Sequence, residues 1–125
     1  MEDKNYKIVV VDDEKETLTL INKYLSKNSK YEVLTFIDSE EGLEYVKNNS
    51  QDLILLDMMM PKLEGLDFLK IVKGDKINTK VVMMTAFSTL DRVLESHKLG
   101  AEGYIMKPFE SLSVLDDKII EVLDI

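Results

Sequence analysis

The sequence predicts an α/β protein in which helices cover both faces of one parallel β-sheet. Short apolar runs alternate along the chain with longer segments whose apolar residues recur at helical spacing. Strands buried on both faces of a parallel sheet appear as nearly continuous apolar runs, because helices shield both sides. Strand–helix alternation also implies right-handed crossovers, so the predicted architecture is a doubly wound sandwich.

The first strand, helix and second strand are predicted from the residues that follow the polar start of the chain. Lys7–Val11 is the first strand, and the helix after it runs from about Lys15 to Lys27. Tyr31–Phe36 follows as a strand, because it is rich in β-branched and aromatic residues. The helix carries an apolar stripe, which consists of Leu18, Ile21 and Leu25.

The next two helices are marked mainly by their ends. Asp38, with Glu41 three residues later, resembles a capping box, so a helix is predicted to begin there and to stop at Asn48. Leu53–Leu56 is the third and most apolar strand. Another helix follows, and Gly74 stands where a C-cap residue is expected. The apolar positions of these two helices are Leu43, Val46, Leu66, Leu69 and Val72.

The last part of the chain repeats the alternation twice. Lys80–Met84 is the fourth predicted strand, and the helix after it ends at Gly100. Tyr104–Met106 is a short fifth strand, and the final helix reaches the end of the chain. Both helices have apolar residues at helical spacing. These residues are Leu90, Val93 and Leu94 in the first, and Leu112, Leu115, Ile119 and Leu123 in the second.

Length and composition limit the classes of protein to which this chain can belong. The 125 residues fit one domain, 1–125, long enough for a real core. With 24 acidic and 16 basic residues the formal net charge is −8, which does not favour direct binding to nucleic acid. The absence of cysteine excludes disulfides, thiolate catalysis and zinc–thiolate sites. The segment Met1–Lys7 is no signal peptide and no apolar stretch could span a membrane, so we expect a cytoplasmic protein.

Polar residues of different kinds follow four of the predicted strands. Asp12 and Asp13 come after the first strand and Asp57 after the third. Thr85 follows the fourth strand, and Lys107 follows the fifth. The carboxyl ends of parallel strands meet at one edge of the sheet, and ligands bind there in open α/β sheets. The sequence therefore predicts a pocket that contains three carboxylates, a hydroxyl and an ammonium group.

Such a pocket suits a metal ion and a phosphoryl group. Carboxylates held within a few ångströms repel one another, and one of them protonates unless a cation binds. An all-oxygen site with room for phosphate oxygens favours Mg²⁺. Asp57 is the predicted nucleophile, because a carboxylate can attack phosphorus and form an acyl phosphate. Lys107 would then neutralise charge on the transferring group, and Thr85 would donate a hydrogen bond to it.

The segments around these residues resemble the receiver domains of two-component response regulators. The resemblance covers essentially the whole chain, and the motifs occur in the order and at the spacing of that family. It implies a flavodoxin-like fold, with a five-stranded parallel sheet of order 2-1-3-4-5 and five helices. The matching segments are Val10–Glu14, Asp57–Pro61 with Gly65, Thr85–Ala86, Gly100–Ala101 and Gly103–Phe109.

The resemblance also implies a role for each residue of the pocket. Asp57 would take a phosphoryl group from a histidine kinase or a phosphotransfer protein. Asp13, Asp57 and the backbone carbonyl of Met59 would bind Mg²⁺, and Asp12 would act mainly through metal-bound water. Lys107 and Thr85 would contact the phosphoryl group.

A switch between two states is the further implication of the resemblance. Thr85 would move toward the phosphoryl group and Tyr104 would rotate into the space that it vacates. The surface formed by the fourth helix, the fifth strand and the fifth helix would then change, and a downstream protein partner would dock there.

The resemblance also implies a cis peptide bond at Lys107-Pro108, as in other members of the family. Met59 and Phe87 replace polar residues often found at their positions, which predicts restricted access of water and a slowly hydrolysed phosphate.

Other functions fit the sequence less well. Haloacid-dehalogenase-type phosphohydrolases also use an aspartate nucleophile with Mg²⁺, but they need a second Asp where this chain has Met59. A flavodoxin-like FMN carrier needs a phosphate-binding loop rich in Ser, Thr and Gly, whereas the acidic segment Asp13–Glu16 would repel phosphate. The chain could also be the excised receiver of a longer DNA-binding regulator, which would keep the same pocket.

Overall fold

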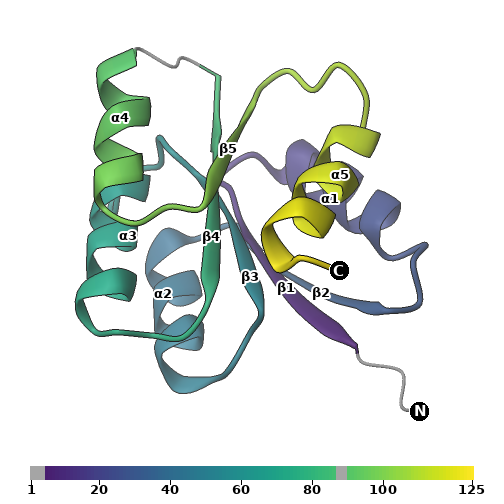
Figure 1. Ribbon diagram of the computed structural model, residues 1–125, viewed down its shortest axis with the longest axis horizontal. Coiled ribbons are helices and arrows are strands. Elements are labelled where there is room, and N and C mark those ends of the chain that lie inside the picture. The colour runs from purple at the N-terminus through teal and green to yellow at the C-terminus, as the bar shows by residue number, and fades with distance from the viewer. Residues whose placement is uncertain (1–4, 87–89) are drawn as a thin grey trace.

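The computed structural model describes residues 5–86 and 90–125 and contains one five-stranded parallel sheet (Figure 1). The strand order is β2-β1-β3-β4-β5, which confirms the predicted doubly wound, flavodoxin-like fold. Each predicted strand is found, with ends that differ from the prediction by at most one residue. The strands are β1 (Tyr6–Val11), β2 (Tyr31–Phe36), β3 (Leu53–Asp57), β4 (Lys80–Thr85) and β5 (Gly103–Met106).

Five helices connect and follow the strands, and they lie on both faces of the sheet (Figure 1). The helices α1 and α5 pack on one face, and α2 and α3 pack on the other, where α4 also lies. The helices are α1 (Lys15–Leu25), α2 (Ser39–Asn48), α3 (Gly65–Gly74), α4 (Leu90–Lys98) and α5 (Ser113–Leu123).

The core consists of two apolar layers, one on each face of the sheet. In β1, Ile8 and Val10 belong to the layer under α1 and α5, and Val9 and Val11 belong to the layer under α2 and α3. All four side chains are fully buried, because successive strand residues point to opposite faces and both faces are covered. This explains why the inner strands are uninterrupted apolar runs rather than alternating ones.

The ends of two helices test the predicted boundaries. The Asp38 side chain caps α2 by accepting hydrogen bonds from the amides of Glu40 and Glu41, as the capping signal predicted. The C-cap prediction at Gly74 was wrong: Gly74 is the last helical residue, and Lys76 adopts the left-handed conformation, with φ of 57°. The amides of Asp75 and Lys76 bond to the carbonyls of Ile71 and Lys73, so the C-cap is Asp75, one residue later than predicted.

The helix α4 lies where the sequence predicted it, but its two leucines do not lie on its buried side. Leu90 is 71% exposed and Leu94 is 47% exposed, whereas Ser96 is 3% exposed. Gly100 follows the helix with φ of +102°, a backbone conformation that glycine adopts without strain, so the predicted end near Gly100 is confirmed. No helix within residues 5–86 and 90–125 has both the length and the apolar character that a membrane crossing requires.

Candidate functional site

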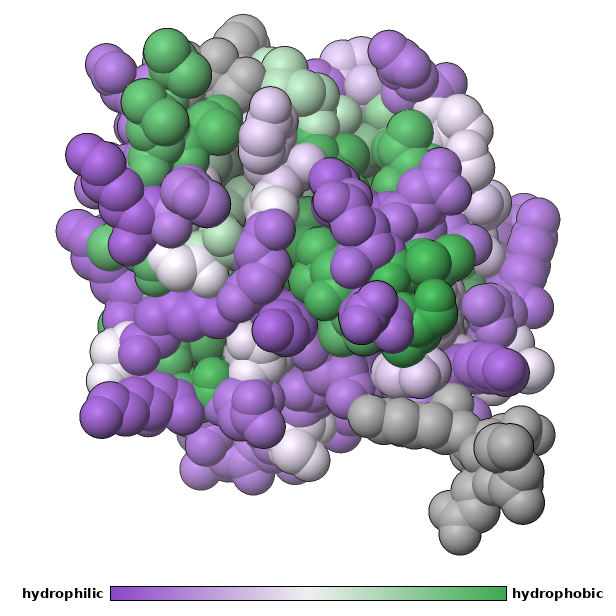
Figure 2. All heavy atoms as spheres, viewed as in Figure 1, coloured by the Kyte–Doolittle hydropathy of each residue, from purple (hydrophilic) through white to green (hydrophobic). Residues whose placement is uncertain are grey.

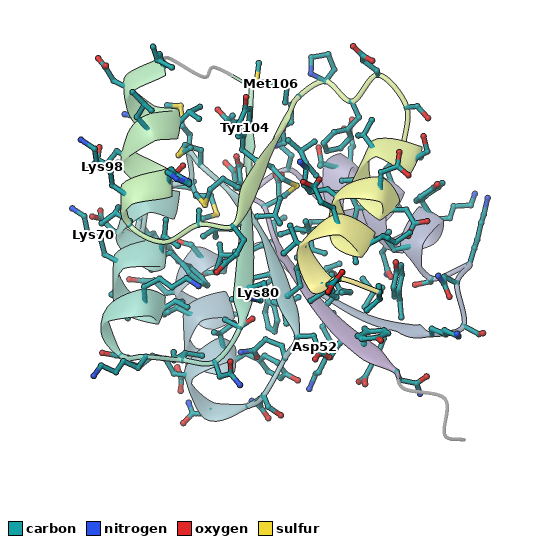
Figure 3. All side chains as sticks on the ribbon, viewed as in Figure 1. Asp52, Lys70, Lys80, Lys98, Tyr104 and Met106 are labelled. Carbon is teal, nitrogen blue, oxygen red and sulfur yellow. The ribbon has the colours of Figure 1, made fainter. Side chains whose placement is uncertain are left out.

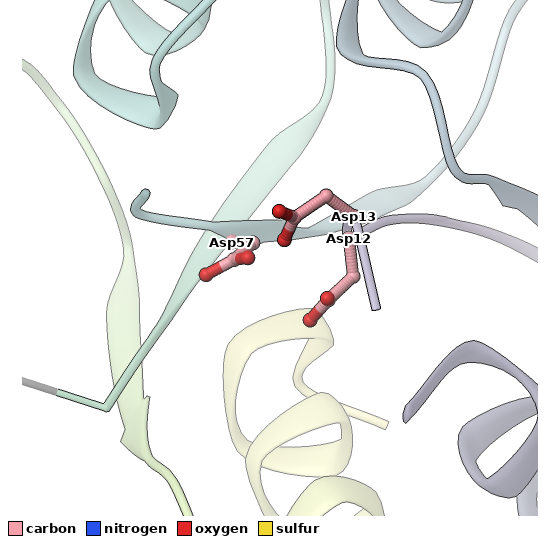
Figure 4. A group of neighbouring side chains, drawn as sticks. All are labelled: Asp12, Asp13 and Asp57. Carbon is pink, nitrogen blue, oxygen red and sulfur yellow. The ribbon is translucent and has the colours of Figure 1, made fainter. Parts of the chain in front are cut away.

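Three carboxylates meet at the carboxyl ends of β1 and β3 (Figure 4). Val11 pairs with Leu56 in the sheet, so the residues that follow them, Asp12 and Asp57, reach the same edge. Asp13 is the next residue along the chain, and one oxygen from each of the three carboxylates lies within 4.8 Å of the others. Asp12 and Asp57 are buried, and Asp13 is exposed. The cluster is therefore open to solvent on the Asp13 side.

Lys107 enters the cluster from the end of β5. Its ammonium Nζ lies 2.6 Å from Asp12 Oδ2, 3.2 Å from Glu14 Oε1 and 3.7 Å from Asp57 Oδ1. The backbone amide of Lys107 donates to the Thr85 carbonyl, which continues the pairing of β4 with β5 and fixes the base of the side chain. The Lys107-Pro108 bond is cis. The lysine therefore contacts Asp12 most closely, within reach of Asp57.

Burial and mutual repulsion change the acidity of this cluster. Burial, and then the negative charge of Asp12, raise the pKa of Asp57 to about 7, although the nearby Lys107 ammonium opposes the shift. Burial also raises the pKa of Asp12, against the hydrogen bond from Lys107. Burial lowers the pKa of Lys107, but the hydrogen bond and charge of Asp12, the charge of Asp57 and the contact with Glu14 together outweigh burial and raise it. Two buried carboxylates that resist ionisation together form a site that a cation would stabilise.

The donor set fits Mg²⁺. All the candidate side-chain ligands are carboxylate oxygens, and a hard divalent cation prefers oxygen ligands. One side of the cluster is exposed, which leaves room for water or phosphate oxygens. Binding would also favour the ionised form of Asp57, which its surroundings otherwise disfavour.

Thr85 and Tyr104 differ sharply in exposure. Thr85 ends β4, is 1% exposed, and its hydroxyl has no hydrogen-bond partner within the described part of the chain. A buried hydroxyl without a partner is costly, so it is ready to bond to a group that enters the site. Tyr104 is 46% exposed and lies on β5 beside α4 (Figure 3).

Met59 lies in the loop between β3 and α3. Its side chain is 48% exposed, and its amide lies 3.4 Å from Asp57 Oδ1. The Gly65 amide donates to the Met58 carbonyl at 2.9 Å and closes the base of this loop. Phe87, which the sequence predicted to restrict water together with Met59, lies outside the described residues.

Two contacts near the site were not anticipated from the sequence. Glu14 pairs with Lys107, and the third acidic residue after Asp12 and Asp13 was the only signal that could have indicated it. Ser39, at the start of α2, is 3% exposed and its hydroxyl contacts the loop after β3. Its partners are 22 and 24 residues away along the chain, so no local pattern could have revealed this contact.

Exposed apolar side chains gather beside the site, on α4 and β5. We call this surface, formed by Leu90, Leu94, Tyr104 and Met106, the α4–β5 face. Their exposed fractions are 71%, 47%, 46% and 46%. Figure 2 shows apolar side chains over α4, and Figure 3 shows Tyr104 and Met106 along β5. Tyr104 and Met106 lie on β5, and Lys107 directly follows this strand. The strand β5 therefore links the α4–β5 face to the acidic cluster.

Comparison with known proteins gives one consistent result. The family described as "Response regulator receiver domain" matches residues 8–119. The alkaline phosphatase synthesis transcriptional regulatory protein PhoP of Bacillus subtilis is 40% identical over 88% of this chain and 45% of its own length. The sporulation initiation phosphotransferase F of the same organism is 35% identical over 90% of both chains.

Solved structures agree with the sequence comparisons. The receiver domain of the Francisella response regulator 1452 superposes with a TM-score of 0.88 at 31% identity, covering 96% of this chain and 98% of that one. A CheY-like receiver domain protein from Methanospirillum hungatei JF-1 gives a TM-score of 0.90 at 31% identity, over 97% of this chain and 95% of that one.

The relatives fall into two groups by length. The chain spans 45% of PhoP and 48% of the transcriptional regulatory protein DltR of Streptococcus agalactiae, about half of each. It spans 90% of the sporulation phosphotransferase. In both groups the match covers most of this chain, between 87% and 90% of it. The chain therefore belongs to the response regulator receiver domain family of two-component systems.

Proposed function

We propose that this receiver domain accepts a phosphoryl group on Asp57, in a Mg²⁺-dependent reaction with a phosphohistidine donor. The donor would be a histidine kinase or a phosphotransfer protein. The observation that carries the proposal is the convergence of three carboxylates within 4.8 Å, with the Lys107 ammonium 3.7 Å from Asp57. This set combines a nucleophile, cation ligands and a positive charge for the transferred group.

The transfer exchanges one bond to phosphorus for another. An Asp57 oxygen forms the new O–P bond while the P–N bond of the donor breaks, and its electron pair returns to the imidazole nitrogen. Lys107 would neutralise charge on the phosphoryl oxygens, and the unpartnered hydroxyl of Thr85 would donate a hydrogen bond to one of them. The product is an acyl phosphate.

Asp13, Asp57 and the carbonyl of Met59 would hold Mg²⁺, and Asp12 would act mainly through water bound to the metal. When bound, the cation neutralises negative charge on the carboxylates and on the incoming phosphoryl group. The Asp12–Lys107 pair, at 2.6 Å, supports the less direct role of Asp12, since that oxygen is already occupied. Asp13 is the exposed member of the cluster, which suits a ligand that meets an ion arriving from solvent.

Phosphorylation would be read by a downstream protein partner at the surface of α4, β5 and α5. Thr85 and Tyr104 would form the switch, with Thr85 moving toward the phosphoryl group and Tyr104 moving inward from its 46% exposed position. The exposed side chains of the α4–β5 face support a protein partner, because grouped apolar residues mark interaction sites. The net charge of −8 argues against direct contact with nucleic acid.

The setting of this chemistry is also part of the proposal. We propose that residues 1–125 act as one receiver unit in the cytoplasm, where kinases or phosphotransfer proteins supply the phosphoryl group. Relatives that are transcriptional regulators are about twice as long as the segment they share with this chain, whereas the sporulation phosphotransferase is nearly the same length. The acceptor chemistry is the same in either setting.

A labelling experiment tests the acceptor. Incubation with a small phosphodonor and Mg²⁺ should add the mass of one phosphoryl group, and base or hydroxylamine should remove it, as expected for an acyl phosphate. The variant Asp57→Asn should not be labelled, because an amide is a far poorer nucleophile than a carboxylate. Asp67→Asn, which changes an exposed aspartate on α3, is the matched control and should be labelled normally. Undiminished labelling of Asp57→Asn would contradict the assignment.

A further inference from the structure

The hydroxyl of Ser39 joins the start of α2 to the loop that follows Asp57. Ser39 Oγ donates to the Pro61 carbonyl at 3.1 Å and accepts from the Leu63 amide at 3.3 Å. The side chain is 3% exposed, so water does not readily replace these bonds. One buried hydroxyl therefore holds two backbone groups on either side of Lys62.

A second, weaker tie comes from the neighbouring residue. Asp38 Oδ1 caps α2, and Asp38 Oδ2 lies 2.6 Å from Lys62 Nζ. This ion pair is more exposed, with side-chain exposures of 58% for Lys62 and 22% for Asp38, and exposed pairs contribute little. Lys62 also has φ of 70°, which residues other than glycine seldom adopt. The Leu63 amide also donates to the Pro61 carbonyl at 2.8 Å, so this backbone bond and the Ser39 hydroxyl together hold the loop in its unusual conformation.

The other end of the loop is fixed to the sheet. Met58 is fully buried, its amide donates to the Met84 carbonyl, and its own carbonyl accepts from the Gly65 amide at 2.9 Å. Between this anchor and the Pro61 carbonyl held by Ser39 lie only two residues, Met59 and Met60. Met60 is itself 6% exposed and belongs to the core. The backbone of Met59 is therefore restrained from both sides.

We propose that Ser39 is a positioning residue for the Mg²⁺ site, and that it acts by holding the backbone of Met59. This inference rests on the proposed function, in which the Met59 carbonyl is a ligand. Mg²⁺ demands nearly ideal octahedral geometry, so a carbonyl free to swing is a poor ligand. Replacing a group that orients a metal ligand typically weakens metal binding by about 10–100-fold. Ser39 touches no ligand atom itself, and its effect passes through Pro61.

The test compares two buried serines. Ser39→Ala removes the hydroxyl that holds the loop. Ser96→Ala removes the hydroxyl of a residue of equal exposure, 3%, which bonds to the Val93 carbonyl within α4. Calorimetric titration with Mg²⁺ should show roughly tenfold weaker binding for Ser39→Ala and unchanged binding for Ser96→Ala. Urea denaturation should show that both variants are folded and similarly destabilised.

Hydrogen exchange supplies a second readout that needs no metal. In the metal-free protein, the Leu63 amide should exchange faster in Ser39→Ala, because it loses the Ser39 hydroxyl as an acceptor and the turn that keeps its bond to the Pro61 carbonyl loses a buried tie. Amides of β3 should keep their protection in that variant. Wild-type Mg²⁺ affinity in Ser39→Ala would overturn the positioning role and leave the proposed function intact. An equal loss of affinity in Ser96→Ala would overturn it too. If the wild-type protein itself bound no Mg²⁺, the proposed function would fail instead.

Discussion

Gly65 packs so closely against the end of β3 that a side chain has no space there. A Cβ atom at this position would lie 2.3 Å from the Asp57 carbonyl oxygen and 2.8 Å from Met58 Cα. Both neighbours are backbone, so they cannot move aside without shifting the strand end that carries Asp57. The requirement for glycine here thus arises from space around the acceptor, and no positive φ is involved.

Replacing glycine by alanine should therefore change the free energy of unfolding in opposite directions at the two ends of α3. Gly65→Ala should destabilise the protein by about 1–3 kcal/mol, because the added methyl group overpacks the strand end. It should also slow phosphorylation of Asp57. Gly74→Ala meets no atom within 4 Å and should stabilise the helix by about 0.5–1 kcal/mol, since alanine loses less entropy than glycine. Urea denaturation of both variants is the measurement, and equal effects would refute the packing explanation.

At the scale of elements, α4 and α5 differ in what their apolar residues do. In α5, Leu115 and Ile119 are fully buried against the sheet. In α4, Leu90 and Leu94 are exposed, and Ser96 is the buried residue. Helical apolar spacing usually marks the side that faces the core. In α4 the outward leucines instead form part of the α4–β5 face, where a partner would bury them.

Leucine-to-alanine changes should distinguish these two roles. Leu115→Ala should cost about 2–5 kcal/mol of unfolding free energy, because it leaves a cavity in a closely packed layer. Leu94→Ala should cost no more than about 1 kcal/mol, since roughly half of that side chain is already in water. Denaturant unfolding gives both values. A loss of several kcal/mol in Leu94→Ala would show that α4 is a core helix and not a docking surface.

For the whole molecule, the acidic cluster should make stability depend on pH in the absence of metal. The pKa of Asp57 is raised from 3.8 to about 7 in the folded protein, so the folded state holds this proton more tightly than the unfolded chain does. The stabilising contribution is complete below the unfolded value of 3.8, and it is lost as the pH rises through about 7. The metal-free protein should therefore lose stability between the unfolded pKa of 3.8 and the folded pKa of about 7, measured by thermal unfolding at a series of pH values. Asp57→Asn should show a smaller decline.

Mg²⁺ should reverse this loss at pH 8, because it binds the ionised carboxylates of the native state. At a hundred times the dissociation constant, a ligand specific for the native state adds about 2.7 kcal/mol. Asp13→Ala should abolish most of the gain and can raise the metal-free melting temperature by relieving repulsion. If Mg²⁺ stabilised Asp13→Ala as much as the wild-type protein, the cation would have to sit elsewhere.

The sequence by itself determined the order and type of the elements and the residues at the strand ends. Strands that are buried on both faces are continuous apolar runs, which makes them easy to recognise in the sequence. Local signals such as the Asp38 cap mark where a helix begins. Once the strands are parallel, the sheet must bring Asp12, Asp57 and Lys107 to one edge.

The tertiary structure decided what depends on contacts between distant segments. The outward position of Leu90 and Leu94 depends on how α4 packs, which helical spacing cannot reveal. The C-cap of α3 is Asp75 rather than Gly74, because the amides of Asp75 and Lys76 find carbonyl partners in the last turn. Ser39 holds the loop after Asp57 across more than twenty residues of chain. A local sequence pattern encodes backbone preference and burial, whereas these features arise from which surfaces meet when the chain folds.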